Sequence, residues 1–382
     1  MSIFKKTLSC AVLAALGTCA LAGCGRQDTS NEATTSVSPE TSAAITETVS
    51  ESTAASEQTP APNAPGIQSA GPTDKTSTPF GQHGALHVEN GKLTDADGNT
   101  VQLYGMSTHG IAWFPQYINY DSFRTLRDDW NTNCIRLAMY TAEYGGYCAG
   151  GDKEQLKQLV RDGVSYATEL GMYVIVDWHI LSDCDPNQNK DEAIAFFREM
   201  SEAFADNDNV LYEICNEPNS GTSWDSIKSY AEEVIPVIRE QKPDAVILVG
   251  TPTWSQEIDK AAASPLTFDN VMYTLHFYAG THKDDLRNRL ETCAQNNLPV
   301  FVSEFGMCDA SGNGANDFDS TTKWLDLLNK YQISFCCWNL ANKDESSSVF
   351  KAASTALSDW TDEDFNESGR WIRDYFRSMP RN

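Results

Sequence analysis

The chain has 382 residues and a formal net charge of −25, from 53 acidic and 28 basic side chains. This large excess of negative charge excludes nucleic acid and anionic surfaces as expected partners, and it favours a neutral substrate. The length is sufficient for one large domain with additional segments.

Residues 1–23 are predicted to be an export signal. Lys5 and Lys6 precede an apolar stretch over residues 8–21, which is too short for a stable transmembrane helix. The signal ends in Leu-Ala-Gly before Cys24, a sequence that resembles the bacterial lipoprotein signal. The resemblance implies an exported, cell-surface lipoprotein whose membrane contact is a lipid on Cys24. An ordinary secretory signal, with a released protein, is the alternative.

Residues 24–84 are predicted to be a disordered linker. The segment is rich in Ser, Thr, Ala, Glu and Pro and has almost no large apolar residue, so it cannot bury enough surface to fold. A flexible chain of this length reaches on the order of 40 Å. It would hold the following domain, residues 85–380, away from the anchoring surface.

The domain at residues 85–380 alternates strand-like apolar runs with amphipathic segments. Two short runs around Asp97-Gly98 predict a hairpin across the bottom of the domain. Strands are predicted at 101–106, 134–139, 172–177, 210–215, 245–249, 271–275, 300–303 and 333–338. Helices are predicted at 153–170, 191–205, 224–241, 284–296, 318–331 and 367–376.

Eight strands interleaved with helices predict the α/β class and a single (β/α)8 TIM barrel. A doubly wound open sheet is the alternative fold, although the chain lacks the Gly-rich turn that would support it. Nearly every predicted strand leads into polar or aromatic residues, which should meet at the C-terminal mouth of a barrel. These residues include His109, Trp113, Tyr140, His179, Trp254, Trp338, Lys343 and Glu345.

Two predicted strands lead into glutamates that are candidates for a catalytic pair. The run at 210–215 is followed by Asn216 and Glu217, and the run at 300–303 is followed by Glu304. The two acids are about three strand–helix units of roughly 30 residues apart. Carboxylates at that separation can face each other only if the sheet closes, so the pair favours the barrel.

Side-chain alternation places Arg136 inside this barrel. Glu213 and Glu217 share one face of their strand, so a pocket-facing Glu217 puts Glu213 in the interior. A bare carboxylate there is costly, and Arg136 is the available counter-charge. We therefore predict that Arg136 lies below the catalytic acids and pairs with one of them or with Glu213.

Paired carboxylates beside histidine, tyrosine and tryptophan side chains fit glycoside hydrolysis. One acid, kept protonated, donates to the leaving oxygen, while the other attacks or activates water. Aromatic rings fit the apolar faces of pyranose sugars. His109, His179 and His276 could bind a metal with the glutamates, but the chain has no HxH or HExxH spacing. Neither a metal nor a cofactor is expected.

Five motifs resemble those of glycoside hydrolase family 5, and more narrowly of its bacterial endo-β-1,4-glucanase (cellulase) subfamily. In chain order they are Asp177-Trp178-His179, Asn216-Glu217-Pro218, His276-Phe277-Tyr278, Ser303-Glu304-Phe305-Gly306 and Trp338-Asn339-Leu340. The resemblance extends from about residue 86 to 377. The resemblance implies hydrolysis of internal β-1,4-glucosidic bonds in cellulose or a related β-glucan.

The resemblance also implies individual roles. Glu217 matches the general acid/base and Glu304 the nucleophile, so anomeric configuration should be retained, with carboxyl groups roughly 5–5.5 Å apart. Arg136 and Tyr278 match the groups that hold the nucleophile ionised and oriented. Asn216 matches the residue that bonds the sugar 2-hydroxyl. His276 matches the residue near the acid/base, and the eight residues beyond the strand ends match substrate-binding positions.

Export would permit disulfides. Cys148 and Cys184 follow neighbouring strands at the same barrel end, so they are expected to pair. Cys134, Cys215 and Cys336 are predicted to be small buried side chains.

Two alternatives to an endo-β-1,4-glucanase remain at this point. One is a non-catalytic cell-surface glycan-binding protein on the same barrel, and the other is a related mannanase, xyloglucanase or mixed-linkage glucanase. The expected partner is a β-glucan polysaccharide or cello-oligosaccharide, and the expected oligomeric state is a monomer.

Overall fold

The computed structural model describes residues 75–380. The expected export signal, Cys24 and most of the expected linker lie outside the described residues. The strands are β1 (His87–Glu89), β2 (Lys92–Thr94), β3 (Tyr104–Thr108), β4 (Cys134–Tyr140), β5 (Tyr173–His179), β6 (Val210–Glu213), β7 (Ile247–Val249), β8 (Val271–Thr274), β9 (Phe277–Tyr278), β10 (Val300–Gly306) and β11 (Phe335–Leu340).

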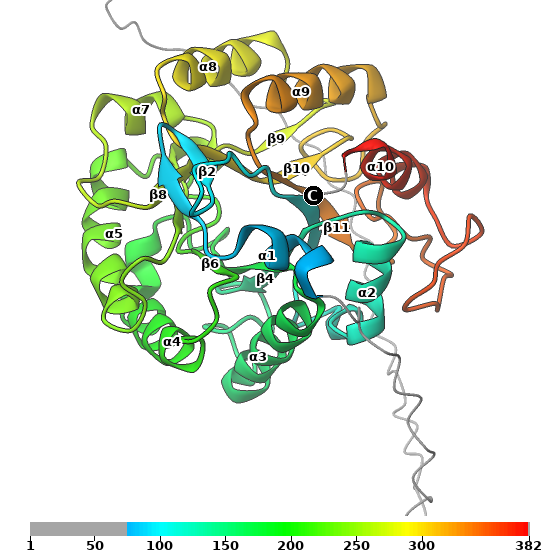
Figure 1. Ribbon diagram of the computed structural model, residues 1–382, viewed down its shortest axis with the longest axis horizontal. Helices are drawn as coiled ribbons and strands as arrows, with labels where there is room; N and C mark the ends of the chain where they lie inside the picture. The colour runs from blue at the N-terminus through cyan, green and yellow to red at the C-terminus, as the bar shows by residue number, and fades with distance from the viewer. Residues whose placement is uncertain (1–74, 381–382) are drawn as a thin grey trace, which may run out of the picture. The chain divides into compact units, whose positions relative to one another are not determined.

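Eight parallel strands form a closed barrel. Their order is β11-β3-β4-β5-β6-β7-β8-β10, and pairing between β10 and β11 closes the ring. The short strand β9 pairs with the end of β10. Figure 1 shows the strands at the centre and the helices around them. The predicted (β/α)8 barrel is confirmed, and the open sheet is wrong because that sheet would leave β10 and β11 unpaired with each other.

The helices that follow the strands are α2 (Tyr120–Asp128), α3 (Lys153–Leu170), α4 (Lys190–Ala203), α5 (Trp224–Arg239), α6 (Pro252–Ser255), α7 (Ile258–Ala263), α8 (Asp284–Gln295), α9 (Phe318–Tyr331) and α10 (Glu367–Ser378). Local capping explains the bounds of α3: the Asp152 side chain accepts hydrogen bonds from two first-turn N–H groups, and Gly171 ends the helix at φ 67°. Within residues 75–380, no helix is long and apolar enough to cross a membrane.

Two short helices begin the described part of the chain, η1 (Lys75–Ser77) and α1 (Pro79–His83). Both fall within the segment that the sequence assigned to the linker. Phe80 attaches α1 to the barrel: its N–H donates to the carbonyl of Gly171 at 2.8 Å, and its ring packs against Tyr173 at 5.8 Å. These contacts involve residues far along the chain, so composition alone did not indicate them.

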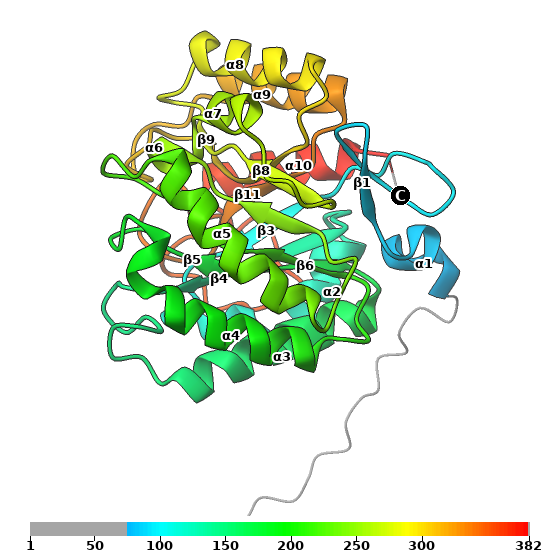
Figure 2. The same cartoon turned by 90° about the vertical axis from the view of Figure 1, so that its left-hand side faces the viewer.

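The N-terminal hairpin forms between β1 and β2, and its turn is at Asn90-Gly91. The predicted turn at Asp97-Gly98 is also present. Thr94 and Thr100 form an antiparallel bridge across it, and the N–H of Val101 donates to the carbonyl of Leu93 at 2.9 Å. The Asp95 carboxylate closes this second turn by accepting hydrogen bonds from the N–H groups of Asp97 and Asn99. Figures 1 and 2 show the hairpin and α1 at one end of the barrel. The predicted capping position is therefore correct.

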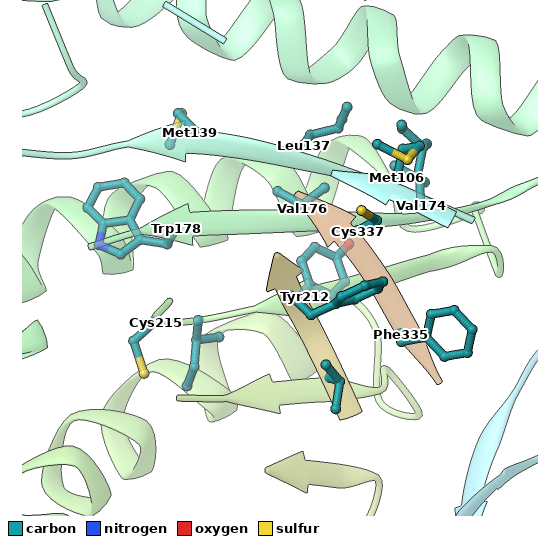
Figure 3. Close-up of a cluster of buried hydrophobic side chains, with 14 of the residues drawn as sticks. Met106, Leu137, Met139, Val174, Val176, Trp178, Tyr212, Cys215, Phe335 and Cys337 are labelled. Atoms are coloured by element: carbon teal, nitrogen blue, oxygen red, sulfur yellow. The ribbon is translucent and has the colours of Figure 1, made fainter. Parts of the chain in front are cut away.

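Side-chain alternation divides the core into two regions. One cluster fills the lower interior of the barrel and includes Leu103, Cys134, Tyr173, Leu211 and Leu248, all buried. The other lies between the strands and the helices, and Figure 3 shows part of it. Cys336 belongs to the first cluster and Cys337 to the second, because neighbouring strand residues point to opposite faces.

Close backbone approach distinguishes one position in β3. Gly105 lies in register between Cys134 on β4 and Cys336 on β11. A Cβ at Gly105 would lie 1.8 Å from the carbonyl oxygen of Cys134, so the strands leave no room for a side chain. Two residues further along, Ser107 is in register with Arg136.

Candidate active site

A cleft of about 710 Å³ opens at the C-terminal mouth of the barrel. Most of the residues predicted for the site line it: His109, Trp113, Tyr140, His179, Glu217, Trp254, His276, Tyr278, Glu304, Trp338, Lys343 and Glu345. Arg136 and Asn216 do not line the cleft; they are buried and bonded to the residues that do. The structure therefore brings all of these predicted side chains together.

Glu217 and Glu304 face each other in this cleft. Glu304 lies within β10, whereas β6 ends four residues before Glu217. The segment that carries Glu217 is held beside the end of β5 by hydrogen bonds from its N–H to the carbonyl of Ile180 and from the N–H of Asn216 to the carbonyl of Trp178. Both side chains are buried, and one carboxylate oxygen of each lies within 4.8 Å of the other.

Arg136 lies beneath the two acids, as predicted. All five of its N–H groups donate hydrogen bonds: two to the carboxylate of Glu213, one to Glu304, one to Asn216 and one to Ser107. The bonds to Glu213 measure 2.8 and 3.1 Å. This fully used guanidinium compensates for the carboxylates around it, which burial would otherwise penalise.

His276 connects Glu217 to the buried Glu213. Its Nδ1 lies 3.0 Å from Glu217 Oε1 and its Nε2 lies 2.9 Å from Ser303 Oγ, while Ser303 donates to Glu213 at 2.8 Å. Burial alone would lower the pKa of His276, but Glu213 and Glu217 outweigh burial and raise that pKa to about 9. The ring is therefore cationic at neutral pH and donates from both nitrogens.

Tyr278 supplies the second donor to Glu304. Its hydroxyl donates to Oε1 at 2.9 Å, while Arg136 donates to Oε2 at 3.1 Å. Burial and the nearby carboxylates raise the pKa of Tyr278 well above its usual range, so the phenol keeps its proton. Glu304 thus has a donor on each oxygen, which fixes the orientation of its carboxylate.

Aromatic rings form one wall of the cleft. His179 packs between Tyr140, at 4.0 Å, and Trp338, at 5.3 Å. His109 lies beside Trp338 as well, at 5.1 Å. Burial and the charge of Lys343 lower the pKa of His109 to about 3, so this ring stays neutral.

The two exposed tryptophans mark the outer parts of the cleft. Trp113 is 36 % exposed and Trp254 is 45 % exposed. The Trp113 indole N–H donates to the carbonyl of Tyr144 at 3.0 Å, which fixes the ring at the cleft edge. Lys343 and Glu345 pair at 2.5 Å between their charged atoms and line the same cleft.

Sequence reasoning missed several residues at the site. Asp177 is fully buried 3.0 Å from Arg136, and alternation along β5 from His179 could have found it. Ser303 could not be found in this way, because a register shift in β10 turns both Ser303 and Glu304 toward the interior. Glu143 and Gln256 line the cleft from loops, which have no periodic signal.

Glu217, His276 and Glu304 offer the one group of possible metal ligands among the described residues. The fit is poor, because both nitrogens of His276 already face hydrogen-bond partners and its raised pKa keeps both protonated. A metal ligand must be the neutral imidazole.

The expected disulfide between Cys148 and Cys184 is wrong: both thiols are free. The Cys184 thiol instead lies 3.3 Å from the carbonyl of Ser182 and 3.3 Å from the Ser220 hydroxyl. Cys148 packs at the edge of the helix–strand core. Loops at the same barrel end thus direct their cysteines to different neighbours.

Comparison with known proteins gives a consistent result. Residues 94–344 match the model of the family described as cellulase (glycosyl hydrolase family 5). Endoglucanase A of Butyrivibrio fibrisolvens is 51 % identical over 300 residues, which cover 78 % of this chain and 70 % of that protein. An endoglucanase of Clostridium saccharobutylicum is 46 % identical over 303 residues, covering 78 % of this chain and 66 % of that protein.

A solved structure shares the architecture. The catalytic domain of Thermobifida fusca endoglucanase Cel5A, in a variant complexed with cellotetraose, is 42 % identical with a TM-score of 0.75. The match covers 79 % of this chain and all of that one. The chain therefore belongs to glycosyl hydrolase family 5, the cellulase family, and is a glycoside hydrolase of the endoglucanase type.

Proposed function

We propose that the protein is a retaining endo-β-1,4-glucanase that cleaves internal bonds of cellulose or a related β-glucan by double displacement. The observation that carries the proposal is the facing pair, Glu217 and Glu304, with carboxylate oxygens within 4.8 Å across an aromatic-lined cleft. Such close approach fits the retaining spacing of about 5–5.5 Å, because an inverting enzyme separates its acids by about 6.5–9.5 Å to admit water.

Glu304 is the nucleophile in this proposal. Donors from Arg136 and Tyr278 hold and orient its two oxygens. It attacks the anomeric carbon and forms a glycosyl-enzyme ester, while Glu217 donates its proton to the departing glycosidic oxygen. Glu217 then removes a proton from water, which attacks the ester and frees Glu304.

His276 supports the change of protonation state of Glu217. The cationic ring donates to Glu217 Oε1, which stabilises the carboxylate left after proton donation. Asn216 lies beside Glu217 and bonds Arg136, a position that suits a contact with the sugar 2-hydroxyl. The exposed rings of Trp113 and Trp254 suit stacking against sugars farther along the chain.

The substrate assignment rests on the relatives, which are named endoglucanases, and on the cellotetraose complex of the Thermobifida fusca enzyme. Internal cleavage fits a cleft that is open rather than a closed pocket. Mannan, xyloglucan and mixed-linkage glucan are the rival substrates, because the same pair of acids would act on each.

Export as a lipoprotein is part of the same proposal. The Leu-Ala-Gly-Cys24 sequence and the two preceding lysines support lipidation of Cys24, with residues 24–84 as the tether. A monomer anchored in this way would act on polysaccharide at the cell surface, and a net charge of −25 suits a partner that is not nucleic acid. Labelling with a radioactive fatty acid, compared in the wild type and Cys24→Ala, tests the anchor.

The function is tested on carboxymethyl cellulose by viscosity and reducing-sugar release, for the wild type, Glu217→Gln and Glu304→Gln. We expect a rapid fall in viscosity that either substitution abolishes, and initial products in the β-anomeric form by proton NMR. Activity on mannan or xyloglucan alone would change the substrate and keep the mechanism. Binding without cleavage of any β-glycan would favour the glycan-binding alternative.

A further inference from the structure

Asp177 is a fully buried acid at the end of β5, and the double-displacement steps above give it no task. We propose that Asp177 is a positioning residue that fixes the tautomer of His179 and, through His179, the orientation of Asn216. This inference rests on the proposed function for its effect on catalysis. The hydrogen-bond geometry itself does not depend on the substrate.

Two partners of Asn216 show which way its amide is oriented. Arg136 donates to its Oδ1 at 2.7 Å, and its Nδ2 donates to the carbonyl of Ile180 at 3.1 Å. A guanidinium offers no acceptor and a carbonyl offers no donor. Both contacts therefore require the oxygen on one side and the nitrogen on the other.

This orientation reveals the proton position on His179. The Asn216 Nδ2 also lies 3.2 Å from His179 Nε2, so that ring nitrogen must accept and the proton must be on Nδ1. Nδ1–H then donates to Asp177 Oδ2 at 2.6 Å. Burial, together with the charge of Arg136, lowers the pKa of His179 to about 3, so the ring is neutral at working pH.

Within the described part of the chain, His179 is the one hydrogen-bond donor to the Asp177 side chain, which also forms an ion pair with Arg136. Arg136 Nη2 lies 3.0 Å from Oδ2, but the five N–H groups of Arg136 all donate elsewhere. Among the described residues, Asp177 Oδ1 has no hydrogen-bond partner. Burial raises the pKa of Asp177 well above its usual range, while the charge of Arg136 opposes that rise.

The wrong tautomer would affect several parts of the site. A proton on Nε2 of His179 would point at the Asn216 amino group, placing donor against donor. If Asn216 rotated to avoid this contact, its amino group would face Arg136, which is also a donor. Arg136 holds Glu304, so one misplaced proton would disturb the proposed nucleophile.

The first test is a long-range proton–nitrogen NMR spectrum of the intact chain with nitrogen-labelled histidine, recorded from pH 5 to 8. We expect His179 to show a neutral ring with the proton on Nδ1 throughout. A spectrum with the proton on Nε2, or a ring that becomes cationic in this range, overturns the proposal. This measurement needs no variant of Asp177, and a His179→Asn protein serves only to assign the signal.

The second test compares Asp177→Asn with Asp177→Leu. Asn keeps an acceptor without a charge, so we expect Asp177→Asn to keep the Nδ1 tautomer of His179 and a kcat within about threefold of wild type. Leu has a similar shape but no acceptor. We therefore expect Asp177→Leu to lower kcat about 100-fold with little change in KM. Tautomer and kcat must change together. A large loss of kcat in Asp177→Asn with the tautomer intact, or full activity in a folded Asp177→Leu, would refute the proposal.

Different results would refute the proposed glucanase function and the proposed role of Asp177. A wild type that cleaves no β-glycan refutes the proposed function, while its histidine spectrum still decides the tautomer. If Asp177→Leu does not fold, the spectra of the wild type and Asp177→Asn, with the kcat of Asp177→Asn, carry the test.

Discussion

The interior of the barrel has a lower and an upper layer built on the same strands, with opposite chemistry. On β4, Cys134 belongs to the lower layer and Arg136 to the upper; on β6, the corresponding residues are Leu211 and Glu213. All four side chains are almost completely shielded from water. A shift of two residues along a strand therefore changes an apolar core into a cluster of charges.

The two layers differ in how they tolerate burial. Apolar side chains gain free energy when they leave water, so the lower layer stabilises the fold by itself. Buried charges gain only when each is paired, so the upper layer is tolerated because Arg136 and His276 compensate for the acids. The lower layer should thus contribute to stability without affecting activity, whereas the upper layer should make both stability and activity depend on its ion pairs and on pH.

The variant Arg136→Met is the strongest test of the difference between the two layers. The change leaves Glu213 and Glu304 buried without their counter-charge, so we expect a loss of about 3–5 kcal/mol in the free energy of unfolding, with activity abolished. Urea denaturation measures the loss. The control is Arg124→Met, because that arginine pairs with exposed acids and should cost about 1 kcal/mol or less. Equal losses of unfolding free energy in the two variants would show that the upper layer does not depend on its ion pairs more than the surface does.

The lower layer is tested by Leu248→Ala. The side chain is fully buried, so we expect a cavity and a loss of about 2–4 kcal/mol in the free energy of unfolding, with kcat within about twofold of wild type. Leu248→Met, which keeps the volume, should cost less than about 1.5 kcal/mol. A fall in kcat that exceeds the change in folded fraction would mean that the layers are not independent.

The upper layer should also give stability a specific pH dependence. Because the folded-state pKa of His276 is raised to about 9 from an ordinary value near 6.5, its stabilising contribution is complete below pH 6.5 and is lost as pH rises through 9. The difference corresponds to about 3 kcal/mol. Unfolding of the wild type and His276→Gln, compared from pH 6 to 10, should show this slope in the wild type alone. Parallel curves would argue against a cationic ring.

The smallest effect on stability is expected at the cleft edge. Trp254→Ala removes an exposed ring, so the free energy of unfolding should change by less than about 0.5 kcal/mol, while KM for long cello-oligosaccharides rises by up to about tenfold. Tyr144→Ala is the matched control, because Tyr144 is 93 % exposed and is not part of the cleft lining. A similar change of KM in both variants would show that Trp254 has no specific role in binding the substrate.

Much of the fold and of the candidate site could be predicted because the relevant signals are local. Alternation along a strand placed Arg136 and Glu213 in the interior, and it separated Cys336 from Cys337. The ends of parallel strands converge by geometry, so residues beyond those ends could be grouped without knowledge of their contacts.

The missed features depend on contacts between distant segments. The pairing of Cys148 with Cys184 was wrong because loop conformation, not barrel position, directs each thiol. Ser303 was missed because the irregular register of β10 breaks the alternation rule. The tautomer of His179 depends on contacts among β4, β5 and the segment after β6, and no pattern within one strand encodes it.

Gly105 shows how far a residue without a side chain can influence chemistry. It allows β3 to approach β4 closely, and in the same register Ser107 meets Arg136, whose Nη1 donates to its hydroxyl at 3.2 Å. A library that varied β3 would find position 105 intolerant to every replacement, and the result would look like a packing defect. Part of the loss would concern the site itself, because a single added methyl group would widen the seam and shift the guanidinium that holds Glu304.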